Sequence, residues 1–318
     1  MVRFLHSTWP AMGLVALGAC GSDIGVDPID DTAPPVAFVP VQETFVQRPL
    51  PAVDLLLVVD DTASMGQEQE ALAAEFPGLA EALDAAGVSW QLGVVTTDMG
   101  HAQAGWLRGS PYVLTSGVAH LLPEAVQVGT GGASPEAGMA AAVRALDLAA
   151  PDGPNAGFRR SDAALHVVFV SDADDASDAW LGVDPATALL ARLTAESAAA
   201  PAVVSAVVGD PEGGCVSDKG SAHPGKRYAA AVEATSGALV SICAADLAEV
   251  VASIGEASIV WPTRFPLART PVEGTVRVQV DGRATDAWWF DAPVATVVFV
   301  EPPPASARVE VDYLVEHR

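Results

Sequence analysis

Short apolar runs alternate along this chain with segments of helical period. The first run, Val-Asp-Leu-Leu-Leu-Val-Val, begins at Val53 and lies between Pro51 and the polar residues from Asp60 onward. Runs of this length, rich in branched residues, are typical of buried strands. Similar runs occupy 90–96, 165–171 and 203–208, and helical patterns separate most of them at 67–86, 135–149, 185–199 and 227–234. This order predicts a doubly wound α/β domain with a mostly parallel sheet and helices on both faces.

A second pattern begins near Trp261, where apolar and polar residues alternate strictly. Before it, a last strand at 238–242 and a helix at 246–256 would close the α/β domain, which we place at 52–258. The later segment contains Asp281-Gly282 between alternating runs, which is a strong hairpin signal. We therefore predict a small all-β module at 261–318. Neighbouring Trp288 and Trp289 should point to opposite faces of a strand, so that one contributes to the core and the other is exposed or covered by the first domain.

The first 19 residues have the features of a signal peptide. Arg3 precedes an apolar stretch that ends in Leu17-Gly18-Ala19-Cys20. Two small residues before a cysteine, with Leu one position further back, resemble the signature of bacterial lipoproteins. That resemblance implies a lipid on Cys20 and a membrane-anchored protein of the bacterial cell envelope, facing the periplasm or the outside. Gly21 instead of Asp after the cysteine favours the outer membrane, and an ordinary secretory peptide is the alternative.

Residues 20–51 have the composition of a tether. Five prolines and several aspartates lie between Gly21 and Pro51, and proline-rich segments adopt extended conformations. Within this segment, Val36 to Val46 alternates apolar and polar residues as a strand does, so part of the predicted tether could fold back onto the protein.

The two remaining cysteines, Cys215 and Cys243, form a natural pair. An exported chain lies in an oxidising compartment, and a bridge that closes this loop would stabilise the fold by roughly 3 to 4 kcal/mol in the chain-entropy model. A zinc site is the competing hypothesis. It lacks the close spacing of paired cysteine ligands, and no His lies at ligand spacing from either residue.

Charge excludes one class of partner. The 318 residues include 16 basic and 40 acidic side chains, for a formal charge of -24. Nucleic acid binds clustered Lys and Arg, which this chain lacks, so we expect no nucleic-acid partner. No apolar run reaches the roughly 20 residues of a membrane-spanning helix. The six histidines form neither an HExxH motif nor a close pair, and no GxSxG motif is present, so we expect no enzymatic activity.

Acidic and hydroxyl side chains follow two of the predicted strands. The first strand leads into Asp60-Asp61-Thr62-Ala63-Ser64, and the third leads into Ser171-Asp172. Carboxylate and hydroxyl oxygens suit Mg²⁺ or Ca²⁺, and alternate residues of an extended loop can face one ion. For Thr62 or Ser64 alone, capping of the next helix would be the better interpretation. The combination with Asp172 at a second strand end favours an ion site. Asp174 and Asp175 could hold a second cation, but a solvated acidic loop is the better interpretation.

This pattern resembles the metal-ion-dependent adhesion site of von Willebrand factor A domains. The family pattern Asp-x-Ser-x-Ser after the first strand matches Asp60, Thr62 and Ser64, with Thr62 keeping the hydroxyl of the first Ser. The family's later Asp matches Asp172, and the resemblance spans roughly Val53 to Gly255. It implies a divalent cation, Mg²⁺ first and Ca²⁺ or Mn²⁺ as alternatives. It also implies a protein or other extracytoplasmic macromolecule whose carboxylate completes the coordination.

The sequence departs from the family at one ligand. The loop that normally supplies a Thr places Ala133 at that position, and Ser134, Thr130 or water would have to substitute. Loss of one neutral oxygen should weaken cation binding without abolishing it. The alternative function is therefore a structural envelope lipoprotein with a degenerate, metal-free site. A hydrolytic role for the ion is a third hypothesis, for which no base or nucleophile is evident.

Overall fold

The computed structural model describes residues 37–196 and 200–317. The predicted signal peptide at 1–19, Cys20 and the first part of the predicted tether lie outside the described residues. Within those that are described, no helix is both long and apolar enough to cross a membrane.

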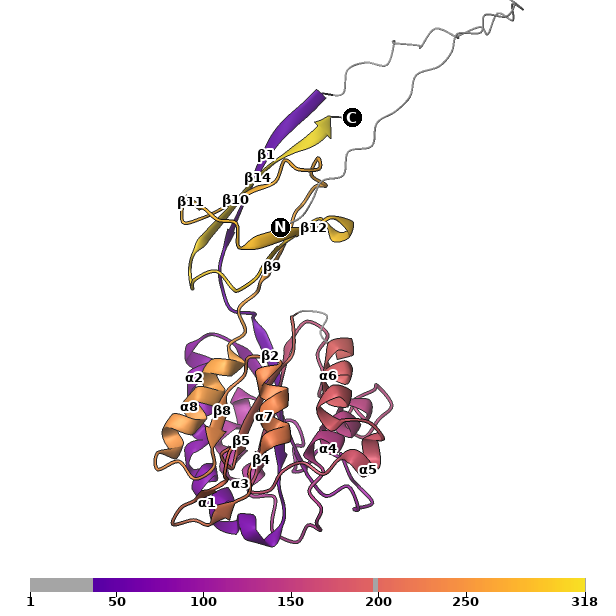
Figure 1. Cartoon of the computed structure of the whole chain (residues 1–318), viewed down its shortest axis with the longest axis vertical. Coiled ribbons are helices and arrows are strands. Elements are labelled where there is room, and N and C mark those ends of the chain that lie inside the picture. Colours follow the sequence, from indigo (N-terminus) through magenta and orange to yellow (C-terminus); the bar gives the residue numbers. More distant parts are fainter. Residues whose placement is uncertain (1–36, 197–199, 318) are drawn as a thin grey trace, which may run out of the picture.

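Five parallel strands form the sheet of the α/β domain, in the order β3-β2-β4-β5-β8 (Figure 1). Every residue of β2 and β4 is buried, because helices cover both faces of the sheet. The fold class predicted from the alternating runs is confirmed. The strands are β2 (Ala52–Val59), β3 (Ser89–Thr96), β4 (Ala164–Ser171), β5 (Val203–Val208) and β8 (Leu239–Ser241).

The helices divide between two apolar clusters, one on each face of the sheet. The first cluster includes α1 (Gly66–Glu75), α2 (Pro77–Ala85), α3 (Leu122–Val126) and α8 (Leu247–Ser258). The second includes α4 (Gly138–Asp147), α6 (Pro185–Glu196) and α7 (Lys226–Glu233). Shorter elements are η1 (Ala63–Met65), η2 (Ser116–Leu121), α5 (Asp178–Leu181), β6 (Cys215–Val216) and β7 (Ser221–Ala222).

The single helix predicted at 67–86 is wrong, because the segment forms two helices that meet at Phe76. Pro77 occupies the first position of α2. Proline has no N–H to donate to the preceding turn, so it starts a helix well and continues one poorly.

The β-rich module consists of two small antiparallel sheets that share one apolar core. Trp288 packs against this core, whereas the side chain of Trp289 is half exposed. The four-stranded sheet contains β1 (Ala37–Val46), β14 (Arg308–His317), β10 (Arg277–Val280) and β11 (Arg283–Ala284). The three-stranded sheet contains β12 (Trp288–Asp291), β13 (Thr296–Phe299) and β9 (Arg264–Pro266), with η3 (Ala292–Val294) between β12 and β13.

Strand β1 joins the two ends of the described chain. All ten of its residues pair with β14, from Ala37 opposite His317 to Val46 opposite Arg308. The tether predicted for 20–51 is therefore wrong from Ala37 onward, and the alternating pattern at 36–46 marked the strand. Because β1 precedes the α/β domain and β9 to β14 follow it, the α/β domain is inserted within the β-rich module.

One histidine lies inside the sheet without contact with water. His166 of β4 is fully buried, its Nδ1 lies 2.7 Å from Ser258 Oγ, and its Nε2 lies 2.8 Å from Ser205 Oγ. Burial lowers the pKa of this imidazole to about 3, because the charged form would lose its hydration. His166 is therefore neutral in the folded protein at neutral pH.

A second buried polar group lies near the amino end of the sheet. The Asp54 side chain is inaccessible to solvent and accepts hydrogen bonds from Arg159 Nη1 at 2.6 Å and Arg160 Nε at 2.7 Å. The backbone N–H of Arg160 donates to the same carboxylate at 2.7 Å. These bonds satisfy a charge that would otherwise be costly to bury.

Candidate cation site at the carboxyl edge of the sheet

The predicted site residues follow neighbouring strands. Val59 of β2 is paired with Val170 of β4, and the Asp60 N–H donates to the Val170 carbonyl at 2.9 Å. The chain after β2 and the chain after β4 therefore begin side by side at the same edge of the sheet. This edge lies at the far end of the α/β domain from the β-rich module (Figure 1).

Asp60 connects these two stretches through its carboxylate. Its Oδ1 accepts hydrogen bonds from the Thr62 N–H at 2.9 Å and the Thr62 hydroxyl at 2.6 Å. Its Oδ2 accepts a bond from the Ser171 hydroxyl at 2.6 Å. The Ser64 hydroxyl lies 3.4 Å from Thr62 Oγ1. Because Thr62 donates its proton to Asp60, the lone pairs of its oxygen remain available to a cation.

The Asp60 carboxylate lies in an environment that opposes its negative charge. Burial raises its pKa, the hydrogen bonds from Ser171 and Thr62 lower it, and the negative charge of Asp172 raises it further. Asp60 and Asp172 are thus close enough to repel each other. A bound cation would remove this repulsion.

Asp61 and Gln69 hold the loop that carries Ala133 against the Asp60 loop. The Gly132 N–H donates to the Asp61 carbonyl at 2.7 Å, and a Cβ added at Gly132 would lie 2.3 Å from Asp61 Oδ1. Only glycine can approach so closely at this position. Gln69 Nε2 donates to the carbonyls of Asp60 at 2.8 Å and Gly129 at 2.9 Å. The family's threonine position therefore lies in a loop that is fixed beside the site.

Ser134 makes a different contact from the one a substitute ligand would need. Its side chain is exposed and its hydroxyl donates to Glu136 Oε1 at 2.8 Å. In the part of the chain that the structure describes, no hydrogen bond joins Ser134 to Asp60, Thr62 or Ser64. Its role as a ligand stays a prediction.

The acidic loop after β4 packs against helices. The prediction that it is solvated is therefore wrong for Asp175. This side chain is only 3% exposed, and its carboxylate accepts bonds from the backbone N–H groups of Met139 and Ser177 and from the Ser177 hydroxyl. It thereby satisfies one free N–H group at the start of α4, that of Met139, and Ser177 Oγ satisfies the next, that of Ala140. Asp174 Oδ1 accepts from the N–H of Arg227 in α7 at 3.0 Å. Met139 and Arg227 lie 36 residues from Asp175 and 53 residues from Asp174 in the sequence, so no local pattern marks these contacts.

The oxygen donors fit a small divalent cation. Mg²⁺ is commonly held by one or two carboxylates and retains several waters, and Ca²⁺ accepts hydroxyl and carboxylate oxygens in a less regular shell. The residues 37–196 and 200–317 contain no group of three or more His, Cys, Asp or Glu side chains arranged to hold a metal. Two hydroxyls with the carboxylates of Asp60 and Asp172 do not require such a group.

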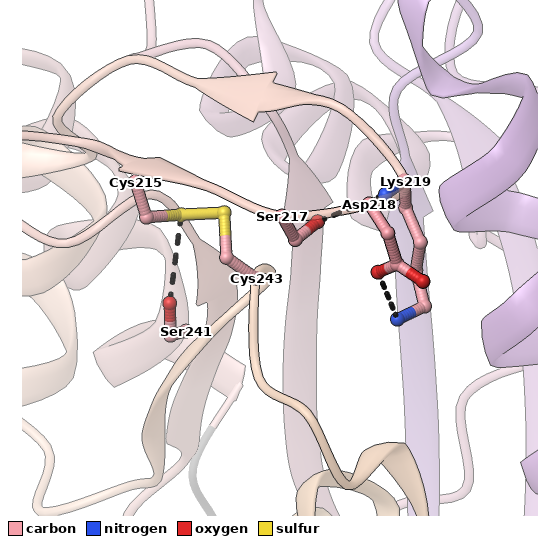
Figure 2. The surroundings of a disulfide bond; sticks show 6 residues. All are labelled: Cys215, Ser217, Asp218, Lys219, Ser241 and Cys243. Carbon is pink, nitrogen blue, oxygen red and sulfur yellow. Dashed lines mark hydrogen bonds and ion pairs between the residues drawn. A yellow bond between two sulfur atoms is a disulfide. The ribbon is translucent and has the colours of Figure 1, made fainter.

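The disulfide predicted between Cys215 and Cys243 is confirmed, with an S–S distance of 2.07 Å. It ties the excursion 209–224, which follows β5, to the segment after β8 (Figure 2). The Ser241 hydroxyl lies 3.5 Å from Cys215 Sγ. The His223 N–H donates to the Asp172 carbonyl at 2.7 Å, so the bridged excursion reaches the candidate site.

No family model and no curated protein matches this chain. Among solved structures, the chain is similar to a von Willebrand factor type A protein from Catenulispora acidiphila, with 16% identity, a TM-score of 0.43, and coverage of 89% of this chain and 62% of that one. It is also similar to proximal thread matrix protein 1 from the mussel byssus, with 14% identity, a TM-score of 0.43, and coverage of 71% and 51%.

A third similar structure is the pilus adhesin SpaC from Lactobacillus rhamnosus GG in its open conformation, with 13% identity and a TM-score of 0.41. The match covers 88% of this chain and 41% of the adhesin. This chain thus spans less than two thirds of each of these proteins. Likenesses at this level do not by themselves indicate a function.

Proposed function

We propose that this protein is an exported, lipid-anchored binding module. It would use a divalent cation at Asp60, Thr62, Ser64 and Asp172 to bind a protein or other extracytoplasmic macromolecule through a carboxylate of that partner. The observation that carries the proposal is the position of Asp60, whose two carboxylate oxygens accept hydrogen bonds from the hydroxyls of Thr62 and Ser171. The stretches after β2 and β4 are joined there, as a shared cation requires.

The proposed mechanism depends on charge reversal. The chain is strongly acidic, and Asp60 and Asp172 would repel an approaching carboxylate in the absence of a cation. A bound divalent cation supplies positive charge and an open coordination position. Asp60 holds the Thr62 hydroxyl in place, and the exposed Ser64 lies where a partner can approach. Binding of the partner should therefore depend strictly on the cation.

The arrangement of the chain supports anchoring at the N-terminal end. The lipoprotein-like sequence around Cys20 precedes β1, and β1 belongs to the module at the opposite end from the candidate site (Figure 1). A lipid on Cys20 would thus leave the cation site pointing away from the membrane. We propose the outer membrane as the location and binding, without catalysis, as the role.

Isothermal titration calorimetry of the full chain with Mg²⁺, Ca²⁺ and Mn²⁺ tests the cation. The wild type should bind, and Asp60→Asn should bind at least about tenfold more weakly because it removes a negative charge and leaves one acceptor oxygen for the Thr62 and Ser171 hydroxyls. Asp162→Asn is the matched control, since Asp162 is exposed just before β4 at the other edge of the sheet.

Two results would contradict the proposal. Equal heats from the wild type and Asp60→Asn would place the cation elsewhere. An absence of binding by the wild type would instead favour the second candidate, a structural envelope lipoprotein with a metal-free site. Ala133 at the family's threonine position and the hydrogen bond from Ser134 to Glu136 are the observations that favour that candidate.

A further inference from the structure

Glu68 has a buried carboxylate, and the resemblance to von Willebrand factor A domains assigns it no role. It lies in the first turn of α1, and its residue is only 4% exposed. Its Oε2 has no hydrogen-bond partner, and a Cβ added at Gly220 would lie 2.4 Å from its Oε1. The carboxylate is thus enclosed between α1 and the excursion 209–224. A buried charge without a partner is costly, so this position calls for a positive charge nearby.

The charges around Glu68 are those of the candidate cation site. Burial is the largest cause that raises its pKa, and the negative charges of Asp172 and Asp60 raise it further, whereas Lys219 lowers it. The excursion also links Glu68 to the site by contact, because Gly220 covers the Glu68 carboxylate and the His223 N–H, three residues later, donates to the Asp172 carbonyl at 2.7 Å. Asp60 accepts hydroxyl hydrogen bonds on both of its oxygens, whereas Glu68 Oε2 accepts none.

The excursion encloses the Glu68 carboxylate in a tight turn but, in the described part of the chain, forms no ion pair with it. The Ser217 N–H donates to the Gly220 carbonyl at 2.8 Å, and the Lys219 N–H donates to Ser217 Oγ at 3.1 Å, so the turn before Gly220 is tight. The Lys219 ammonium lies 3.4 Å from Asp218, which is mostly exposed (Figure 2). Among the described residues, no ion pair joins Lys219 to Glu68.

We propose that Glu68 is a further ligand of the divalent cation, contributed by α1, and that it supplies charge together with Asp172 while Asp60 positions the hydroxyls of Thr62 and Ser171. This inference rests on the proposed cation site. It gives the site two carboxylate ligands in addition to the hydroxyls of the Asp60 loop. Because cation affinity rises with the number of charged ligands, Glu68 would compensate for the oxygen that Ala133 does not provide.

Calcium titrations of the full chain, with the disulfide intact, test the role of Glu68. Glu68→Gln should bind Ca²⁺ at least about tenfold more weakly than the wild type, since it removes a charged ligand and keeps the shape of the side chain. Glu68→Asp keeps the carboxylate on a side chain that is shorter by one methylene, and it should bind Ca²⁺ with an intermediate affinity. Glu70→Gln is the matched control, because Glu70 lies on the same helix and is exposed.

Thermal unfolding distinguishes a ligand from a structural carboxylate. In EDTA, Glu68→Gln should be at least as stable as the wild type, because an unpaired buried charge is gone. On addition of Ca²⁺, it should gain less stability than the wild type does. A variant that is less stable in EDTA but gains as much from Ca²⁺ would overturn the inference.

The outcomes separate this inference from the proposed function. Wild-type affinity in Glu68→Gln, with weakened binding in Asp60→Asn, would overturn the role of Glu68 and leave the cation site intact. An absence of Ca²⁺ binding by the wild type would overturn both. Weakened binding in Glu68→Gln and Asp60→Asn, with unchanged binding in Glu70→Gln, would support both.

Discussion

Acidification should destabilise the α/β domain through His166. The unfolded chain binds a proton on this imidazole near its ordinary pKa of 6.5, whereas the folded protein does so only near 3. Between these values the unfolded state holds more protons, so the free energy of unfolding falls as the pH falls. The stabilising contribution is present above about pH 6.5 and is lost progressively below it.

The size of the effect follows from the same two pKa values. Each pH unit inside the window costs about 1.4 kcal/mol, so at about pH 5 the wild type should have lost about 2 kcal/mol on account of His166. Carboxylates act in the opposite sense where burial raises their pKa, as in Asp60 and Asp175. They gain stability as the pH falls through their folded pKa. A comparison with His166→Gln cancels their contribution.

Urea unfolding followed by far-UV circular dichroism provides the assay, because all the described α-helices belong to the α/β domain. Between about pH 7 and about pH 5, the difference in unfolding free energy between the wild type and His166→Gln should shift by about 2 kcal/mol in favour of the variant. A constant difference over this range would refute the reasoning. It would show that the folded protein accepts the proton on the imidazole between Ser205 and Ser258.

Three further variants test the fold. Asp54→Ala should lower the free energy of unfolding by about 3 to 5 kcal/mol, because two arginines lose their buried partner; a loss below about 1 kcal/mol in urea unfolding would contradict this. Replacing Cys215 and Cys243 together by Ala should cost roughly 3 to 4 kcal/mol in the chain-entropy model, measured by the same method, and unchanged stability would show that the excursion is not held by the bridge. Tyr228→Phe should stabilise by about 1 kcal/mol in a thermal melt, since the buried hydroxyl has no partner; destabilisation would reveal one.

The strands of the α/β domain were predictable because burial on both faces leaves a continuous apolar run, as in β2 and β4. The sequence placed Asp60 and Asp172 at the carboxyl ends of two parallel strands, but the pairing of β2 with β4, which brings those ends together, had no signal in the sequence. The helix break at Phe76 had a visible signal in Pro77, which the apolar periodicity outweighed.

Other features depend on contacts between distant segments. The enclosure of Glu68 by Gly220, the burial of Asp175 under α4 and the clamp by Gln69 have no local signature, because each partner lies far away in the chain. The pairing of strand β1 is likewise a contact between distant segments. Its alternation marked a possible strand, but its partner β14 lies at the other end of the described chain.

The insertion of the α/β domain after β1 has a mechanical consequence. A pull applied between the segment before Ala37 and the far edge of the α/β domain runs along the covalent backbone of β1 into β2, and the rest of the β-rich module lies beside this path (Figure 1). The ten residues of β1 are already extended, at about 3.3 Å each. Detaching β14 from them would release almost no slack, so such a pull would reach the base of the parallel sheet with little stretch.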